Sequence, residues 1–593
     1  MRLVCSLILA LAAVAPTAEA RSLYGTVPSV EAADLLTLKH PAGSYAIRVY
    51  GVDLTDDSAA NQAARQLTAA FVKDRTVRAR IMTRNAAGEM ESIVLADGKD
   101  LGLELLKAGL ALRQPNVHYK PTRDGEADAL VLAETEARLA HRGLWQLPEV
   151  SAAADDAEPE RPRLPDALLV AGTVDINTSV KTGDDNECAA AIDPSNPQRM
   201  FLSCNTASAG LFATRTVNGG QTWTYPDASD KTIADGDAGQ GQSACCDPTL
   251  AWDRFGNLYV TYINAATNSI VTLLSTDAGL TYTEIGNFTG SVDQPTIVAA
   301  NVGANANIWI VWNDSGSIAA RGAQATALGT VGAFGAKQTL AGSSDCNFGD
   351  IAISPTGVMV QICEQPSGGE GPANLRFATD ADGLGAGLWS TATTATTTNV
   401  GGFDFIPAQN ARSVDAEAGL AYDSLSTSPR FGRLYLVYTE ETTNESNDLD
   451  VLVRYSDNNG SSWSTPIKVN DDATTRSQFL PKIAVDPTTG NIGVCWHDAR
   501  ASANNTTMQL YCATSAPLAT PVFTPNNQVS DGASLSNGAG VEFGDYMGVA
   551  FVNGQLRPVW GDTSNSTANN PGGFDAYTDA ATASPQLFKN GFE

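Results

Sequence analysis

Polar side chains stand at the start of strand-like segments throughout the long C-terminal part of this 593-residue chain. Because equivalent strands of a repeated β-structure end at the same face, we expect these side chains to converge on one opening. Most are carboxylates, which suit the binding of calcium, an amine or sugar hydroxyl groups, and suit a carboxylate ligand poorly. The candidates for this channel face are Asp185, Glu187, Asp247, Asp293, Gln294, Asp350, Gln478, Asp545 and Tyr546.

Two other groupings have the composition of catalytic pairs. His497 and Asp498 are adjacent in the stretch "WHDAR", and we expect a packed or capping pair there. Glu542 and Tyr546 lie four positions apart in a predicted turn, a spacing that gives little support to a Tyr–Glu nucleophile pair.

The strands that must position the channel-face candidates recur as one unit. Its paired strands are clear in "DPTLAWDRFGNLYVTYIN" and "PKIAVDPTTGNIGVCWHD". Four-stranded units repeated in this way predict a mainly β chain with a β-propeller. Seven unit starts favour seven blades, and six is the alternative if one unit is degenerate. We expect residues 167–176 to supply the strand that the last unit lacks and so to close the ring.

Glycine turns recur in "TRTVNGGQTWTYPD", "LLSTDAGLTYTEIG" and "VRYSDNNGSSWSTPI". An Asp or Asn there can accept hydrogen bonds from turn amides, Gly tolerates positive φ, and the aromatic residue can fill the seam between blades. The pattern resembles the Asp-box of sialidases: Ser275–Tyr282 fits it closely, Ser456–Trp463 fits with a shift, and Thr216–Trp223 has Asn for Asp. The resemblance implies a scaffold role at the turn between third and fourth strands.

Residues 167–581 therefore resemble the sialidase superfamily in fold, a likeness that does not carry activity with it. Sialidases need three arginines on the substrate carboxylate, a Tyr–Glu nucleophile pair and an acid/base Asp. The F/Y-R-I-P stretch that usually holds the first arginine is missing from the sequence.

The N-terminal part, residues 21–150, reads as a smaller α+β domain with strands first and helices after. The stretches "IRVYGVD", "ADGKDLGLELLKAGLA", "HYKP" and "AETEARLAHRGLW" resemble the staphylococcal thermonuclease family. That resemblance implies an OB-type barrel with helices.

The nuclease chemistry of that family uses calcium held by carboxylates, two arginines on the phosphate and an acidic residue near the attacking water. The resemblance places Asp34 and Asp53 at metal positions, Arg48 at the first arginine and Asp56 at the acidic residue. Glu89 stands where the second arginine is expected, and a carboxylate there would repel phosphate. We therefore expect a catalytically degenerate nuclease-like domain.

Cysteine usage indicates disulfides in an exported protein. Three pairs have nearly equal spacing, as neighbouring antiparallel strands would give, whereas two further cysteines are adjacent and can form a vicinal disulfide or remain thiols. The three pairs are Cys188/Cys204, Cys346/Cys363 and Cys495/Cys512, and the adjacent pair is Cys245/Cys246.

The ends of the chain and its linker complete the predicted organisation. Residues 1–20 read as a signal peptide, which predicts a secreted or periplasmic protein. Residues 151–166 are rich in Ala, Pro and acid and read as a linker between domains, and residues 582–593 as a C-terminal tail beyond the propeller at 167–581. No later stretch has the ~20 apolar residues that a membrane span needs. We expect a monomer.

Charge separates the two parts. Residues 151–593 carry 20 Lys and Arg against 47 Asp and Glu, so nucleic acid is an unfavourable partner for this part. Three functions remain: a propeller that binds glycan or protein surfaces, a glycoside hydrolase of sialidase type, and a calcium-dependent nuclease or phosphodiesterase in residues 21–150. We favour the binding protein, with calcium as the one candidate cofactor, and leave open whether either domain is an enzyme.

Overall fold

The computed structural model divides the chain into two compact units, Met1–Pro159 and Glu160–Glu593. The predicted signal peptide, the predicted linker and nearly all of the predicted tail lie outside the residues that it describes. None of the helices described has the length and apolar character to cross a membrane. The described residues are 22–54, 58–73, 75–84, 89–114, 130, 133, 169–170, 175–367, 369–536, 538, 542–564, 568–579 and 581–583.

The first unit is an OB-like barrel of five strands, as the sequence predicts. The strand order is β3-β2-β1-β5-β6, and a parallel pairing of β3 with β6 closes the barrel. Its interior is packed by aliphatic side chains such as Leu36, Ile47 and Val94. The strands are β1 (Ser22–Ala32), β2 (Leu35–His40), β3 (Gly43–Val49), β4 (Val52–Asp53), β5 (Val77–Arg84), β6 (Met90–Ala96), β7 (Lys99–Asp100) and β8 (Leu112–Arg113).

Two described helices pack on this unit. They are α1 (Ser58–Val72) and α2 (Leu101–Lys107), and Asp100 caps α2 by accepting a hydrogen bond from the Gly102 amide at 2.9 Å. Helix α1 lies between β4 and β5 in the chain, so helices alternate with strands instead of following them. The helix predicted from "ADALVLAETEARLAHRGLW" lies almost entirely outside the described residues.

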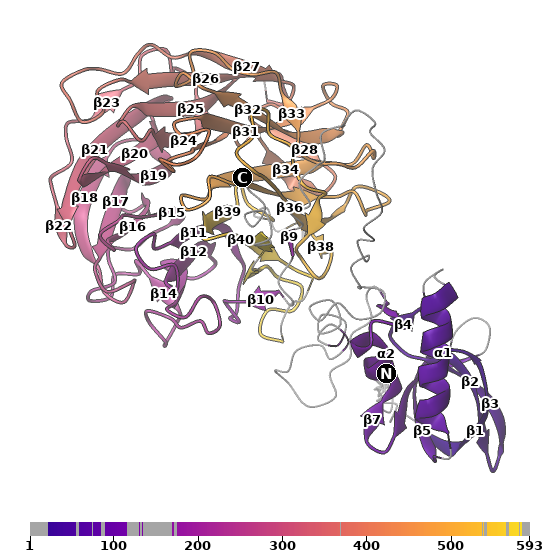
Figure 1. The fold of residues 1–593 in the computed structure, drawn as a ribbon. Helices are drawn as coiled ribbons and strands as arrows, with labels where there is room; N and C mark the ends of the chain where they lie inside the picture. The colour runs from indigo at the N-terminus through magenta and orange to yellow at the C-terminus, as the bar shows by residue number, and fades with distance from the viewer. Residues whose placement is uncertain are drawn as a thin grey trace, which may run out of the picture. The chain divides into compact units, whose positions relative to one another are not determined.

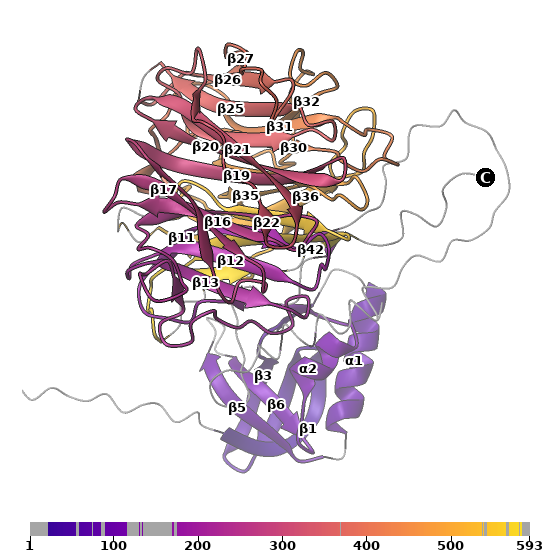
Figure 2. The ribbon, with the colours of Figure 1, turned by 90° about the vertical axis from the view of Figure 1, so that its left-hand side faces the viewer.

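The second unit is a ring of seven antiparallel sheets, which confirms the seven-bladed propeller and removes the six-bladed alternative (Figure 1). Figure 2 shows the same ring from the side. The first blade comprises β11 (Asp185–Ile192), β12 (Met200–Thr206), β13 (Leu211–Thr216) and β14 (Thr232–Ile233). The second comprises β15 (Cys246–Trp252), β16 (Leu258–Asn264), β17 (Ser269–Ser275) and β18 (Thr283–Thr289). The third comprises β19 (Val292–Val302), β20 (Asn305–Asp314), β21 (Ser317–Ala327), β22 (Thr330–Val331) and β23 (Gln338–Thr339).

A short hairpin is inserted between the fourth and fifth blades. It consists of β28 (Asp404–Ile406) and β29 (Gln409–Val414), which pair only with each other. The fourth blade, before the hairpin, comprises β24 (Asn347–Ile353), β25 (Met359–Pro366), β26 (Ala373–Asp380) and β27 (Thr393–Thr398). The fifth blade, after it, comprises β30 (Gly419–Tyr422), β31 (Leu434–Glu441), β32 (Leu449–Ser456) and β33 (Ile467–Lys468).

The ring is closed by a strand from its own beginning, as predicted. The strand β10 pairs with β41 through Ile176 opposite Thr578 and Asn177 opposite Tyr577. The Asn177 side chain also donates to Asp575 at 2.6 Å. The sixth blade comprises β34 (Gln478–Val485), β35 (Ile492–Asp498), β36 (Thr507–Ser515), β37 (Asn527–Gln528) and β38 (Ser534–Leu535). The seventh comprises β39 (Gly548–Val552), β40 (Gln555–Asp562), β41 (Asp575–Thr578) and β10 (Ile176–Asn177). In the seventh blade, β42 (Ala581–Ala583) also pairs with β40, and β9 (Leu169–Val170) pairs with β42.

Four disulfides confirm the pairing predicted from cysteine spacing. Three connect neighbouring strands or strand ends within one blade, and the fourth is vicinal, which settles the open alternative for that pair. The pairs are Cys188–Cys204, Cys346–Cys363, Cys495–Cys512 and Cys245–Cys246. Four disulfides fit an oxidising, extracellular environment.

The three glycine turns lie between the third and fourth strands of their blades and have one bonding pattern. In the turn after β17, Asp277 accepts hydrogen bonds from the Leu280 and Thr281 amides, both at 3.0 Å. Asn218 and Asn458 accept the equivalent amide bond in the other two turns. The turn after β32 therefore needs no shift, because Asn458 takes the position of Asp277.

Candidate functional site

The innermost strands share a backbone irregularity at the face where the polar candidates lie. Their pairing shifts register near the strand start in the first four blades and in the sixth. Such bulges turn side chains out of the regular alternation of a strand, here at residues whose φ is positive. In the first three blades and the sixth, these residues are Glu187 (φ 49°), Asp247 (58°), Gln294 (42°) and Leu480 (49°). Glu417 (40°) also has a positive φ, although it lies before β30 and the pairing of its blade is regular.

The bulges are joined to one another by hydrogen bonds between blades. The Asp247 amide donates to the Asn205 side chain at 2.7 Å, and the Gln294 amide donates to the Asp247 carboxylate at 3.3 Å. The Asp545 amide donates to Glu187 at 3.2 Å. These carboxylates therefore hold neighbouring blades together.

A guanidinium from the inserted hairpin neutralises part of this charge. Arg412, on β29, donates to Asp545 through Nε at 2.6 Å and also through Nη2, and its Nη2 lies 2.7 Å from Glu187. We call Glu187, Asp247 and Asp545 the acidic cluster. Arg412 binds two of its three carboxylates in a charge-assisted arrangement that fixes the hairpin over this part of the ring.

Beside the acidic cluster lies a cavity of about 210 Å³, lined by inner strands from all seven blades. Its polar lining includes Gln294, Asp350, Glu417, Lys482 and Tyr546. Lys482 lies 3.4 Å from Glu417 and 3.9 Å from Asp350. We call this the mouth cavity; it combines donors and acceptors within a space for one small group.

Burial and like charge raise the pKa of three carboxyl groups of the site, Glu187, Asp247 and Glu417. Burial, with Asp293 and Asp545 nearby, raises the pKa of Asp247 to about 7, and burial with Asp350 nearby raises that of Glu417 to about 7 against the opposing effect of Lys482. Burial also raises the pKa of Glu187. Near neutral pH, Asp247 and Glu417 therefore take up and release protons that ordinary surface carboxylates would not hold.

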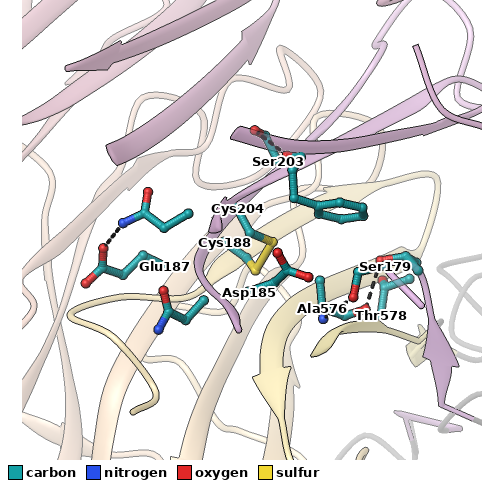
Figure 3. Close-up of a disulfide and its surroundings, with 12 residues drawn as sticks. Ser179, Asp185, Glu187, Cys188, Ser203, Cys204, Ala576 and Thr578 are labelled. Carbon is teal, nitrogen blue, oxygen red and sulfur yellow. Dashed lines mark hydrogen bonds between the residues drawn. A yellow bond between two sulfur atoms is a disulfide. The ribbon is translucent and has the colours of Figure 1, made fainter. Parts of the chain in front are cut away.

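The predicted channel-face residues do not all meet. Gln294, Asp350 and Tyr546 line the mouth cavity, the acidic cluster lies beside it, and Asp293 is exposed nearby. Asp185 lies on the other side of the Cys188–Cys204 disulfide from Glu187, where it pairs with Lys181 at 3.1 Å (Figure 3).

Gln478 is buried within the sixth blade, bonded to Asn470 at 2.8 Å. The sequence suggested the same environment for every strand start, but regular alternation turns Asp185 and Gln478 away from the channel, whereas the bulge turns Glu187 towards it.

Three residues of the site were missing from the predicted set: Arg412, Glu417 and Lys482. Glu417 marks a unit start and could have been found by that position. Lys482 stands two residues after the bulge at Leu480, a place that only the observed backbone reveals. Arg412 comes from the inserted hairpin, and nothing in the repeat indicates it.

The contacts of His497 and Glu542, from the two catalytic-pair candidates, indicate structural roles. His497 is buried, with ring centroids of Phe479 and Phe543 both 5.3 Å away, as a packed residue would be. Glu542 accepts hydrogen bonds from the Ala411 and Arg412 amides, and so holds the hairpin.

In the barrel, the carboxylate that replaces the expected arginine binds the arginine that is present. Arg48 donates to Glu89 through Nε at 2.7 Å and Nη2 at 3.3 Å, and its Nη1 binds Asp34. The hydrogen bond that Arg48 donates to Glu89, with the charge of Asp34, raises the pKa of Arg48. Two carboxylates thus occupy the guanidinium of Arg48.

The carboxylates at the expected calcium positions are engaged elsewhere. Asp34 binds Arg48, and the exposed Asp53 accepts a hydrogen bond from Gln114 at 3.0 Å. Asp56 lies outside the described residues. Within the described ranges, no group of three or more His, Cys, Asp or Glu side chains is arranged to hold a metal ion.

Comparison with known proteins agrees with the barrel. The family model for the Staphylococcal nuclease homologue matches residues 47–147. No curated protein matches the chain. The N-terminal unit is therefore similar to staphylococcal nuclease homologues, both in sequence over residues 47–147 and in its OB-like barrel.

Proposed function

We propose that this protein is an exported binding protein whose propeller takes a terminal sugar unit of a glycan into the mouth cavity. One observation carries the proposal: Gln294 Oε1 is buried at the cavity and has no hydrogen-bond partner among the described residues. A buried acceptor of this kind is costly unless a donor arrives. A sugar hydroxyl is such a donor.

The rest of the lining supports a polyhydroxyl ligand. Lys482 and the Tyr546 hydroxyl can donate, Glu417 and Gln294 can accept, and a sugar hydroxyl does both. The volume of about 210 Å³ is below the ~300–1,000 Å³ of drug-sized sites, which favours one small unit.

Binding is tested with the full chain on a glycan array, followed by calorimetric titration of the best ligand. Lys482→Met should lower affinity at least tenfold, because it removes a donor from the cavity, whereas Lys337→Met should bind as the unaltered protein does. Lys337 is a suitable control because it also pairs with a carboxylate, Asp314 at 2.7 Å, but lies outside the cavity lining. Absence of saturable glycan binding would contradict the proposal.

A screen with fluorogenic sialosides separates binding from hydrolysis. We expect no turnover, since the mouth cavity has one lysine and one neighbouring arginine instead of the three arginines that sialidases use. Turnover that disappears in Glu417→Gln would replace the binding proposal with a glycoside hydrolase.

We also propose that the barrel is not a working nuclease. The ion pairs of Arg48 with Glu89 and Asp34 support this, because a guanidinium that is already paired with two carboxylates is less available to stabilise charge on a phosphate. Loss of one such contact costs ~10²–10³ in rate. We expect no DNA cleavage by the unaltered chain in calcium-containing buffer.

The variant Glu89→Arg tests the cause. It removes a carboxylate from Arg48 and adds the missing cation, so any cleavage should rise in Glu89→Arg and not in the neighbouring control Glu91→Arg. Strong cleavage by the unaltered chain would contradict the proposal.

A further inference from the structure

The vicinal disulfide differs from the other three in its access to solvent. Cys245 is exposed and Cys246 half-buried, whereas the six cysteines of the other pairs are buried, with at most 1% of their surface exposed. Disulfide exchange requires a thiolate to reach a sulfur atom, so accessibility decides which bond reacts. A reductant in solution can reach Cys245 while the propeller stays folded.

The same disulfide contributes little to holding the chain together. Its cysteines are adjacent in the sequence, whereas the cysteines of the other pairs are 16 or 17 positions apart. A cross-link stabilises a fold more when it closes a longer loop, with a logarithmic dependence on loop length, and this one closes almost none. Global stability therefore gives no reason for its presence.

The position of the disulfide links it to the acidic cluster. Cys246 opens β15 and is followed directly by Asp247, whose positive φ is unfavourable for a side-chain-bearing residue and must be held by its surroundings. On one side, the Cys245 amide donates to the Ile263 carbonyl at 2.8 Å. On the other side, Asp247 is bonded to Asn205, which in turn donates to Glu187.

We propose that Cys245–Cys246 is a reversible redox site, reduced by dithiols in preference to the other three disulfides, and that its reduction releases Asp247 from the acidic cluster. A dithiol thiolate attacks Cys245 Sγ, the sulfur–sulfur bond breaks and Cys246 leaves as a thiolate. The second thiol of the reductant then displaces Cys245. Two electrons pass to the protein, both cysteines take up protons, and the reductant leaves as a disulfide.

The experiment treats the folded full chain with dithiothreitol, traps free thiols with N-ethylmaleimide and locates the label by peptide mass spectrometry. We expect label on Cys245 and Cys246 well before any other cysteine, and the six buried cysteines serve as internal controls. Cys245→Ser/Cys246→Ser should take no label under the same conditions. Equal labelling of all four pairs, or none before unfolding, would overturn the redox site.

Hydrogen exchange of the same samples tests the release of Asp247. Reduction should speed exchange of the Asp247 amide at least tenfold and leave β31 and β32 unchanged. Unchanged exchange at Asp247 in the labelled, reduced protein would overturn that half of the proposal.

Any change in glycan affinity on reduction rests on the proposed function. If labelling and exchange behave as expected while no glycan binds in either state, the proposed function fails and the redox site stands.

Discussion

A neutral histidine is enclosed by aromatic rings in the sixth blade. Neither ring nitrogen of His497 has a hydrogen-bond partner within the described structure, and burial lowers its pKa to about 3. An unfolded histidine has a pKa of ~6.5. Between these two pH values, His497 therefore binds a proton in the unfolded chain and not in the folded chain. This contribution to stability is fully present above pH ~6.5 and is lost as the pH falls towards 3.

The variant His497→Phe should remove that loss. Its free energy of unfolding should fall less than that of the unaltered protein between about pH 7 and pH 4, by on the order of 2 kcal/mol. Urea unfolding at the two pH values measures the difference. If both proteins lost the same free energy of unfolding between the two pH values, His497 would not change its protonation on unfolding.

Glu417 in the mouth cavity makes the stability of the protein depend on pH in the opposite direction. The pKa of Glu417 is raised to about 7 in the folded protein, and an unfolded glutamate has a pKa of ~4.3. Its stabilising contribution is therefore present below pH ~4 and is lost as the pH rises through 7.

Replacing this carboxyl group should make stability less sensitive to pH. Glu417→Gln should gain on the order of 2 kcal/mol relative to the unaltered chain on going from about pH 5 to pH 8, as measured by urea unfolding. Glu284→Gln, an exposed glutamate on β18, is the control and should show no such gain. A difference between Glu417→Gln and the unaltered protein that does not vary with pH would contradict the prediction.

The aromatic residues of the glycine turns pack against the neighbouring blade. Tyr282 ends the second-blade turn and packs edge-on against Phe201 of the first blade, with ring centroids 6.4 Å apart. Trp463 packs in the same way on Phe377 of the preceding blade, at 6.1 Å. The asparagine or aspartate shapes the turn, and the aromatic residue fills the seam.

Substitutions at Asp277 should separate charge from hydrogen bonding. Asp277→Ala removes the acceptor of the turn amides and should cost about 1–2 kcal/mol of unfolding free energy. Asp277→Asn should cost less than about 0.5 kcal/mol, because Asn218 and Asn458 hold the same position in the other turns. Chemical denaturation of the three proteins gives both values, and equal losses would show that charge matters more than the bonds.

The sequence predicts these turns well because their requirements are local: an acceptor, a glycine and an aromatic residue at fixed spacing. It does not distinguish Asp457 from Asn458, since either side chain can accept the bond. The structure decides, because Asp457 pairs instead with Arg433 at 2.7 Å.

At the scale of the whole molecule, the first strand of the ring closes its last blade. A chain that begins at residue 179 would lack β9 and β10 and leave β41 with an unpaired edge. Such a chain should melt roughly 1–2 °C below one that begins at residue 160, because ~1–2 kcal/mol of lost pairing is divided by the large unfolding entropy of a unit of this size. Circular dichroism during heating measures this, and equal melting temperatures would contradict a role for β10 in closure.

The number of blades and the closing strand could be predicted because every blade repeats the same pattern. The site could be predicted only in part. Glu187 and Asp247 were found because they open strands, but Arg412 reaches Glu187 from a hairpin more than two hundred residues away. Such an encounter depends on the closed ring, and no local pattern encodes it.

The closing strand has a consequence for the order in which this protein is made. Ile176 leaves the ribosome before any blade exists, and its partner Thr578 is added after the other six blades have been synthesised. The growing chain can build blades one after another, but it holds an incomplete last sheet until synthesis is nearly finished. The ring therefore becomes a closed body in a single late event, and a chain cut short by even one blade has nothing for its first strand to join.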